Sequence, residues 1–240
     1  MSNETQVATD YTDETWNLIE AILPHAPRVL LHGRPATGKT TTAIELARRL
    51  DMPVHVLSCT ADSPAFEARG QYVLRDGSMT WQDGPVVAAR RAGGLLVIDE
   101  IARASGDMLS FLFAATATGT AARLTLPTGE TLEDVASFRV VATMNGDPSE
   151  LLDEALLSRF AVRIAVETTH PAAVATLPVD LQAHAVATVN LDGERRVDIR
   201  SWRAFAHLRD HVGEEHAAAA CWGPRAGVIL DTLRMARAAD

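Results

Sequence analysis

Five short apolar runs recur along the chain, at residues 28–32, 53–58, 94–99, 138–144 and 161–166. Because they are rich in Val, Leu and Ile and lack the alternation of a half-exposed strand, they predict β-strands that are buried on both faces. Stretches with the helical spacing of apolar residues lie between them, and we expect helices at 12–23, 39–50, 85–91, 105–116 and 148–158. Strands that alternate with helices predict an α/β fold with a mainly parallel sheet.

Two segments interrupt this alternation. Each places turn residues between strand-like flanks, which predicts hairpins inserted into the α/β layout at about 70–83 and 121–133. After Thr168 the composition shifts to alanine-rich helical sequence with His and Arg. We therefore predict a flexible N-terminus at residues 1–14, an α/β core at 15–168 and a small helical lid domain at 169–240.

Composition and charge limit the classes of function. The chain has 240 residues, of which 47% are hydrophobic, so it has enough material for a sizeable core. Its formal net charge of −9 counts against a protein that coats nucleic acid, because that mode of binding needs clustered Lys and Arg. No apolar run approaches the roughly 20 residues of a membrane-spanning helix, and the acidic N-terminus lacks the pattern of a signal peptide. We expect a cytoplasmic protein without a membrane span.

The segment "GRPATGKT" follows the first predicted strand and opens a predicted helix. Gly, four residues, Gly, Lys and Thr is the pattern of a phosphate-binding loop, in which backbone N–H groups and the helix N-terminus surround phosphates. Lys39 is expected to bind the terminal phosphates, and the Thr40 hydroxyl to hold Mg²⁺. So short a pattern also occurs by chance, but the strand–loop–helix context favours a nucleotide site. The predicted nucleotide-binding residues are Gly33, Arg34, Pro35, Ala36, Thr37, Gly38, Lys39, Thr40 and Thr41.

Two acidic residues, Asp99 and Glu100, end the apolar run "GLLVIDE". In an arbitrary protein these would more often be solvated acids at the end of a strand. Downstream of a phosphate loop we favour a catalytic interpretation, in which Asp99 holds Mg²⁺ through water and Glu100 polarises the attacking water.

Two further residues are candidates for the same chemistry. Asn145 follows a buried strand and, together with Thr143, is expected at the edge of the sheet that carries Lys39 and Glu100. Its amide is suited to orienting the attacking water and contacting the γ-phosphate, and it is equally suited to beginning a turn with Gly146. Arg159 precedes the last strand and could stabilise charge on a nucleotide bound by a neighbouring subunit, although a lone arginine is more often part of a surface ion pair.

The ordered segments "GRPATGKT", "LLVIDEIARA", "VVATMNGDP" and "LLDEALLSRF" resemble those of the AAA+ ATPases. More narrowly, they are similar to the MoxR and dynein-related branch, which includes activators of the CbbQ and NorQ type, the gas-vesicle GvpN proteins and the McrB motor. The resemblance implies that Glu100 is the catalytic glutamate, Asn145 is sensor 1 and Arg159 is an arginine finger. "IRSWRAF" resembles sensor 2, which implies that Arg203 contacts the γ-phosphate, with Arg200 as a close competitor.

The resemblance also implies a function. It implies an ATPase that uses ATP and Mg²⁺, assembles as a homo-oligomer, typically a hexameric ring, and remodels or activates a protein client, often one with a von Willebrand factor A domain. The hairpins correspond to inserts that face the ring pore. Ala36 stands where glycine is usual, which we expect to be tolerated only if its backbone avoids positive φ. A nucleic-acid motor, such as a restriction-type translocase subunit, and a binding module switched by ATP remain alternatives.

Overall fold

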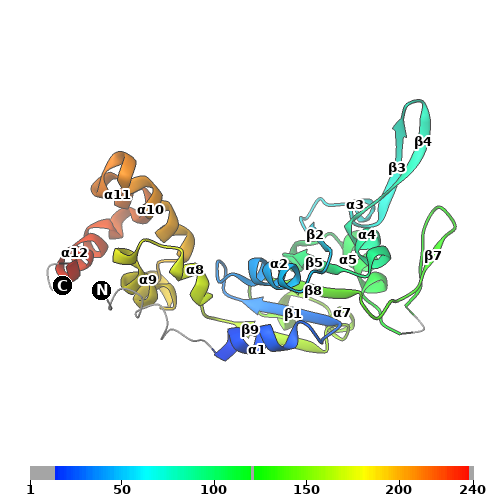
Figure 1. The fold of residues 1–240 in the computed structure, drawn as a ribbon, viewed down its shortest axis with the longest axis horizontal. Helices are drawn as coiled ribbons and strands as arrows, with labels where there is room; N and C mark the ends of the chain where they lie inside the picture. The colour runs from blue at the N-terminus through cyan, green and yellow to red at the C-terminus, as the bar shows by residue number, and fades with distance from the viewer. Residues whose placement is uncertain (1–13, 120–121, 238–240) are drawn as a thin grey trace. The chain divides into compact units, whose positions relative to one another are not determined.

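The structure is a computed structural model and describes residues 14–119 and 122–237 (Figure 1). The predicted flexible N-terminus lies, apart from Glu14, outside the described residues. The chain divides into two compact units. The larger, called here the sheet unit, comprises Leu18–Gly33 and Lys39–Val166. The smaller, the helical unit, comprises Arg34–Gly38 and, among the described residues, 14–17 and 167–237.

A five-stranded parallel sheet in the order β2-β5-β8-β1-β9 forms the centre of the sheet unit (Figure 1). The strands are β1 Arg28–Gly33, β2 Val54–Ser58, β5 Leu95–Asp99, β8 Arg139–Thr143 and β9 Val162–Val166. The three inner strands are buried along nearly their whole length, as predicted. The prediction of burial on both faces is wrong for β2 and β9, which lie at the edges of the sheet and are partly exposed. The predicted α/β fold with a parallel sheet is confirmed, and each strand ends within one residue of its expected bounds.

Helices cover this sheet, and several join one buried apolar cluster. The helices up to β9 are α1 Glu14–Ile22, α2 Lys39–Arg49, α3 Ala65–Arg69, α4 Pro85–Ala92, η1 Ile101–Arg103, α5 Gly106–Ala115, α6 Pro148–Leu151 and α7 Glu154–Leu157. The cluster joins β5 and β8 to α4, α5 and α7, with fully buried side chains such as Leu96, Met108 and Phe160. Burial of these apolar side chains against the sheet stabilises the layered arrangement.

The predicted continuous helix at 148–158 is wrong, because the segment forms the two short helices α6 and α7. The side chain of Asp147 accepts a hydrogen bond from the N–H of Ser149, and that of Asp153 from the N–H of Leu156. A side-chain cap of this kind favours the start of a helix. Leu152 is extended and buried between the two helices, so the second cap begins a new helix instead of continuing the first.

The strands β3 Gly70–Arg75 and β4 Ser78–Asp83 form an antiparallel hairpin that projects beyond the sheet (Figure 1). Asp76 and Gly77 connect them and both have positive φ, as a tight two-residue hairpin turn requires. The cross-strand register places Tyr72 opposite Trp81, with ring centroids 5.3 Å apart. These aromatic residues therefore pack against each other across the hairpin.

The second hairpin has the short strands β6 Leu124–Thr125 and β7 Thr131–Leu132. Leu124, Leu126 and Leu132 are buried against Val87 of α4. In contrast to the first hairpin, this insert is therefore packed onto the sheet unit through its own apolar side chains.

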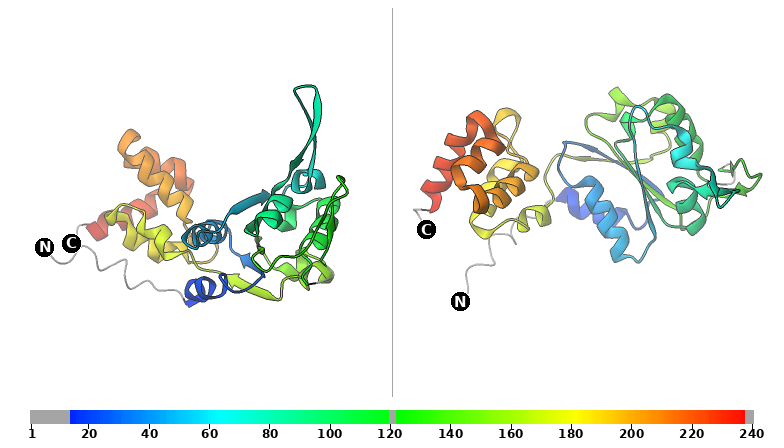
Figure 2. Two further views of the ribbon diagram at one scale, coloured as in Figure 1. Left: turned by 45° about the vertical axis from the view of Figure 1, so that its right-hand side comes forward. Right: turned by 90° about the horizontal axis from the view of Figure 1, so that it is seen from above.

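The helical unit packs around an aromatic core. Its helices are α8 Pro171–Ala175, α9 Val179–Val189, η2 Gly193–Arg195, α10 Ile199–Val212, α11 Glu214–Trp222, η3 Gly223–Arg225 and α12 Ala226–Arg237, drawn from yellow to red in Figure 2. The rings of Trp202 and Phe205 lie 5.0 and 4.4 Å from that of Trp222. Among the described residues, every helix is too short or too polar to span a bilayer.

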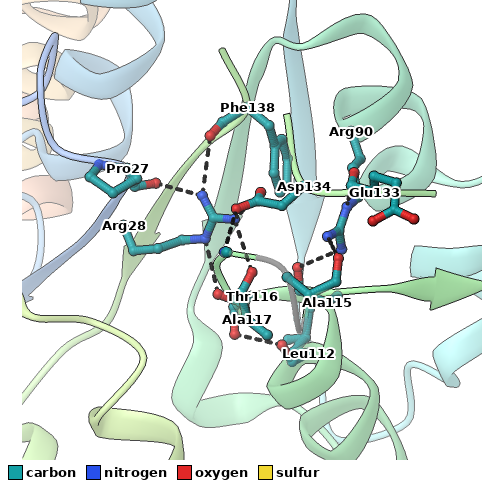
Figure 3. A network of polar contacts seen from close by, with 12 residues as sticks. Pro27, Arg28, Arg90, Leu112, Ala115, Thr116, Ala117, Glu133, Asp134 and Phe138 are labelled. Carbon is teal, nitrogen blue, oxygen red and sulfur yellow. Dashed lines mark hydrogen bonds and ion pairs between the residues drawn. The ribbon is translucent and has the colours of Figure 1, made fainter. Parts of the chain in front are cut away.

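Two buried arginines, Arg28 of β1 and Arg90 of α4, organise the end of the sheet unit that carries the second hairpin (Figure 3). The Arg28 guanidinium donates to the carbonyl oxygens of Thr116 at 3.0 Å and Phe138 at 3.1 Å, and it pairs with Asp134 at 3.2 Å. Burial lowers the pKa of Arg28, and the neighbouring Asp134 carboxylate opposes that shift. Several carbonyl groups that would otherwise lack donors are thus satisfied by one side chain.

Arg90 likewise donates hydrogen bonds to backbone carbonyl groups, here at the base of the second hairpin. It donates to the carbonyl oxygen of Glu133 at 3.1 Å and also to that of Ala122. These two residues flank the second hairpin on either side. The arginine pair therefore holds the hairpin's base and the end of α5 against the sheet.

We expect Arg28→Met to lower the free energy of unfolding by about 3 kcal/mol, because the buried carbonyls and Asp134 lose their donor. Urea unfolding would measure this loss. Arg123→Met is the matched control, since Arg123 is exposed and pairs with Glu133 at 3.2 Å on the same hairpin. That control should change stability by less than about 0.5 kcal/mol, and equal losses for both variants would contradict the assignment.

Candidate functional site

Polar side chains gather at the carboxyl ends of three adjacent strands. β8 lies between β5 and β1, and all three run parallel, so their last residues meet at one edge of the sheet. Asp99 ends β5, Thr143 ends β8, and Lys39 begins α2 shortly after β1. Apolar strand interiors fix the position of the sheet edge, and the polar residues that follow are carried to it together.

A continuous chain of hydrogen bonds joins three of the predicted residues. The Lys39 ammonium, which is almost fully buried, donates to Asn145 Oδ1 at 3.1 Å and to the Gly33 carbonyl at 3.3 Å. Asn145 Nδ2 donates to Glu100 Oε1 at 2.6 Å. The amide therefore links a cation to a carboxylate. Gly146, which follows it with positive φ, donates its N–H to the Gly33 carbonyl, so the same residue also leads into a turn.

Asp99 is the centre of a second set of contacts. Its Oδ1 accepts the Thr40 hydroxyl at 2.5 Å and the Thr143 hydroxyl at 2.6 Å. A carboxylate with two hydroxyls is a set of hard oxygen atoms, which is the ligand chemistry that Mg²⁺ prefers. These residues therefore fit the predicted metal site at Thr40 and Asp99. Thr143 was expected at this edge from its place at the end of a buried strand, but the sequence assigned it no role in the metal site.

Glu100 adopts a backbone conformation that is unusual for a side chain of its size. Its φ is 57° and its ψ is 46°, in the left-handed region. A non-glycine residue there costs about 1–2 kcal/mol, and such strain gathers at functional sites. Arg103 pairs with Glu100 Oε2 at 3.3 Å, so the carboxylate is held by Arg103 on one oxygen and by Asn145 on the other.

Cys59 lies next to this edge and does not supply a thiolate. Its N–H donates to the carbonyl oxygen of Asp99 at 2.9 Å, and its side chain is buried. Burial, with a further contribution from the Asp99 carboxylate, raises the pKa of the Cys59 thiol to about 12. The thiol is therefore neutral at physiological pH and acts as a packing group.

The middle of the phosphate-loop sequence, Arg34–Gly38, belongs to the helical unit. Arg34 forms ion pairs with Glu167, at 2.9 Å, and with Asp192. Arg196 donates to the carbonyl oxygen of Pro35 at 2.8 Å. Side chains of the helical unit therefore hold this segment, and Arg196 is a further contact that the sequence gave no reason to single out.

Ala36 corrects one expectation. Its φ is 60°, so the prediction that this residue avoids positive φ is wrong. The strain for alanine in this region is about 1–2 kcal/mol. Ala36 packs against the buried apolar cluster of the helical unit, and burial of its methyl group offsets part of that strain. Thr37, in the same segment, is buried and accepts the N–H of His170 on its carbonyl oxygen at 2.9 Å.

The predicted site residues Thr41, Arg159 and Arg203 lie outside the two sets of hydrogen bonds around Asn145 and Asp99. Thr41 is exposed on α2. The Arg159 guanidinium lies over the ring of Phe113, and in the part of the chain that the structure describes it has no hydrogen bond to Lys39, Asp99 or Glu100.

Arg203 is placed on α10 of the helical unit. It donates to Thr176 Oγ1 at 3.1 Å and to the Ala173 carbonyl at 3.3 Å. Its competitor Arg200 is exposed in the first turn of the same helix. The sensor roles of both residues remain predictions.

Known proteins resemble this chain in sequence and in fold. The sequence profile of the AAA domain (dynein-related subfamily) matches residues 28–160, which include Lys39, Asp99, Glu100 and Asn145. The chain is 34% identical over 131 residues to Protein NorQ of Paracoccus denitrificans. It is 31% identical over 169 residues to the denitrification regulatory protein NirQ of Pseudomonas aeruginosa.

These two matches cover 53% and 69% of this chain, and 47% and 65% of the relatives. The chain thus spans less than two thirds of the length of either relative.

Solved structures show the same fold. NtrX from Brucella abortus, solved in complex with ATP, has a TM-score of 0.57 at 15% identity, covering 85% of this chain and 52% of that protein. A protein from Cytophaga hutchinsonii has a TM-score of 0.51 at 21% identity, covering 75% of this chain and 51% of that protein. With the profile match over more than half of its residues, the chain belongs to the dynein-related subfamily of AAA domains, the MoxR-type branch that its motifs predicted.

Proposed function

We propose that this chain is a Mg²⁺-dependent ATPase that remodels or activates a protein client, acting in the cytoplasm as a homo-oligomeric, hexameric ring. The observation that carries the proposal is the joint placement of Lys39, Asn145 and Glu100 beside the Asp99 carboxylate. A buried cation, an amide and two carboxylates at one sheet edge are the groups that hydrolysis of a nucleoside triphosphate needs.

Each residue has a distinct task in the proposed reaction. Lys39, at the start of α2, binds the β- and γ-phosphate oxygens in place of its present contact with Asn145. Glu100 accepts a proton from the attacking water, and Asn145 orients that water. Thr40 and Asp99 would hold Mg²⁺, which neutralises the charge on the phosphates. The residues Gly33 to Thr41 supply the remaining phosphate-loop contacts.

Two arginines supply further positive charge to the phosphates in this proposal, one of them from a neighbouring subunit. Arg159 of one subunit reaches the nucleotide of its neighbour as an arginine finger, and Arg203 acts as sensor 2 in the helical unit. In support, Arg159 has no ion-pair partner within the described ranges, so its charge is available to an anion.

A protein client is favoured over nucleic acid, because the net charge of −9 counts against binding to the phosphate backbone. The first hairpin also presents apolar side chains on one face, among them Leu74 and Met79, which are 69% and 61% exposed. By family likeness we propose that the client carries a von Willebrand factor A domain.

We expect Glu100→Gln to lower ATP turnover by at least about 100-fold while ATP still binds, because the variant loses the proton acceptor but keeps the phosphate contacts. Lys39→Ala should lose binding as well. Phosphate release and titration with a fluorescent ATP analogue measure the two effects. Glu150→Gln, an exposed acid in α6, is the control that should remain active. Unchanged turnover of Glu100→Gln would refute its catalytic role.

Affinity capture with Glu100→Gln in ATP and Mg²⁺ should recover a protein client that Lys39→Ala does not recover, because the trapped form remains bound to ATP. Mass spectrometry identifies what is captured. Recovery of DNA or RNA, together with turnover stimulated by nucleic acid, would favour a motor. A partner held equally by ADP-bound and ATP-bound protein, without turnover, would favour a binding module.

Mixing variants tests whether Arg159 acts across the subunit interface. Arg159→Ala and Lys39→Ala should each be inactive alone, whereas an equal mixture should regain about one quarter of wild-type turnover, since that share of random interfaces joins an intact loop to an intact arginine. The control replaces Lys39→Ala with the double variant Lys39→Ala/Arg159→Ala and should stay inactive. Full turnover of Arg159→Ala alone would contradict the role.

A further inference from the structure

The Arg159 side chain is held by an aromatic ring instead of a carboxylate. Its guanidinium carbon lies 4.1 Å from the centroid of the Phe113 ring on α5. A guanidinium over a ring face is attracted by the ring's negative quadrupole, and this attraction grows when the pair is withdrawn from water. Arg159 and Phe113 are both partly buried.

No acidic side chain among the described residues pairs with Arg159, whereas Arg28, Arg34, Arg103 and Arg123 each have such a partner. Its Nε is also buried and has no hydrogen-bond partner in the described part of the chain. A buried N–H donor without an acceptor is unfavourable by about 1–3 kcal/mol. The structure therefore keeps a cation whose charge and donors are not yet used.

Buried neighbours fix the backbone of both Arg159 and Phe113. The N–H of Arg159 donates to the Leu156 carbonyl at 3.0 Å, and its neighbour Phe160 is fully buried. On the other side, Leu112, next to Phe113 in α5, is also fully buried. The backbone at both ends of the contact is therefore fixed by the core, and the ring limits the directions in which the arginine can point.

We propose that Phe113 is a positioning residue for Arg159, holding its guanidinium extended toward an anionic phosphate without neutralising it. This inference rests on the proposed function, in which Arg159 stabilises charge on the phosphates of ATP. A carboxylate in place of the ring would also orient the arginine, but it would compete with the phosphate for the same donors. The ring attracts the cation through its face and leaves the N–H groups at the rim free to donate.

The experiment compares variants of the whole chain under assembled conditions and measures kcat and KM for ATP separately. Phe113→Leu removes the ring while keeping an apolar side chain, and Phe113→Met does so with a longer one. Phe113→Tyr keeps the ring. Phe111→Leu is the matched control, because Phe111 lies on the same helix with similar burial and is packed against apolar clusters. No arginine of the described residues lies over its ring.

We expect Phe113→Leu and Phe113→Met to lower kcat about tenfold, with KM changed less than about twofold. Phe113→Tyr and Phe111→Leu should stay within about twofold of wild type. In an Arg159→Ala background, Phe113→Leu should cause no further loss, because the residue acts through the arginine. A purely structural role would lower thermal stability and would add to the loss in that background.

Three results would overturn the inference alone, in a protein whose turnover depends on Arg159. These are full kcat of Phe113→Leu, equal loss for Phe113→Tyr and Phe113→Leu, or a full additional loss in the Arg159→Ala background. Absence of ATP turnover in the wild-type chain would instead overturn the proposed function, and this inference with it. Full turnover of Arg159→Ala would overturn the finger role on which the positioning depends.

Discussion

Parallel pairing of β5, β8 and β1 is the constraint on which the rest of the sheet unit depends. Strands that run in one direction and lie side by side must end at one edge, so whatever follows them in sequence is brought together there. Asp99, Thr143 and Lys39 come from segments far apart in the chain. The Thr143 hydroxyl nevertheless donates to Asp99, and the Lys39 ammonium donates to Asn145 at the same edge. The apolar residues inside the strands therefore fix the positions of the polar residues at the strand ends.

Backbone strain occurs at two of the predicted site residues. Glu100 and Ala36 both have left-handed backbones without being glycine, which is unfavourable by about 1–2 kcal/mol each. In each case the surroundings compensate, through Asn145 and Arg103 at Glu100 and through apolar packing at Ala36. The other interactions of the fold thus stabilise Glu100 and Ala36 in backbone conformations that are unfavourable in an isolated peptide.

Arginine has three different roles in this chain, and burial and partners distinguish them. Arg28 and Arg90 are buried and satisfy carbonyl groups around the second hairpin (Figure 3). Arg34 and Arg196 hold the middle of the phosphate-loop segment within the helical unit. Arg159 lies over the Phe113 ring, and its buried Nε has no hydrogen-bond partner among the described residues. The same planar cation therefore serves as a structural cross-link, a loop anchor and an available charge.

The sequence alone determined the parts of this protein that depend on local pattern. Near-continuous apolar runs located all five strands of the main sheet, although only the three inner strands are buried on both faces. The phosphate-loop motif and the two acids at the end of the third predicted strand were likewise visible, because their chemistry requires particular residue types at fixed spacing. The break between α6 and α7 was missed because the cap of Asp153 competes with a helical pattern that is otherwise continuous.

Only the tertiary structure decided which side chains meet. The sequence placed Thr143 at the carboxyl-terminal edge of the sheet without a role, and only the fold brings its hydroxyl to 2.6 Å from Asp99. Nothing in the sequence joins Arg34 to Glu167, or Phe113 to Arg159. These contacts link residues distant in sequence, and a hydrogen bond or a cation–π contact depends on a distance and an angle that only the packed fold sets.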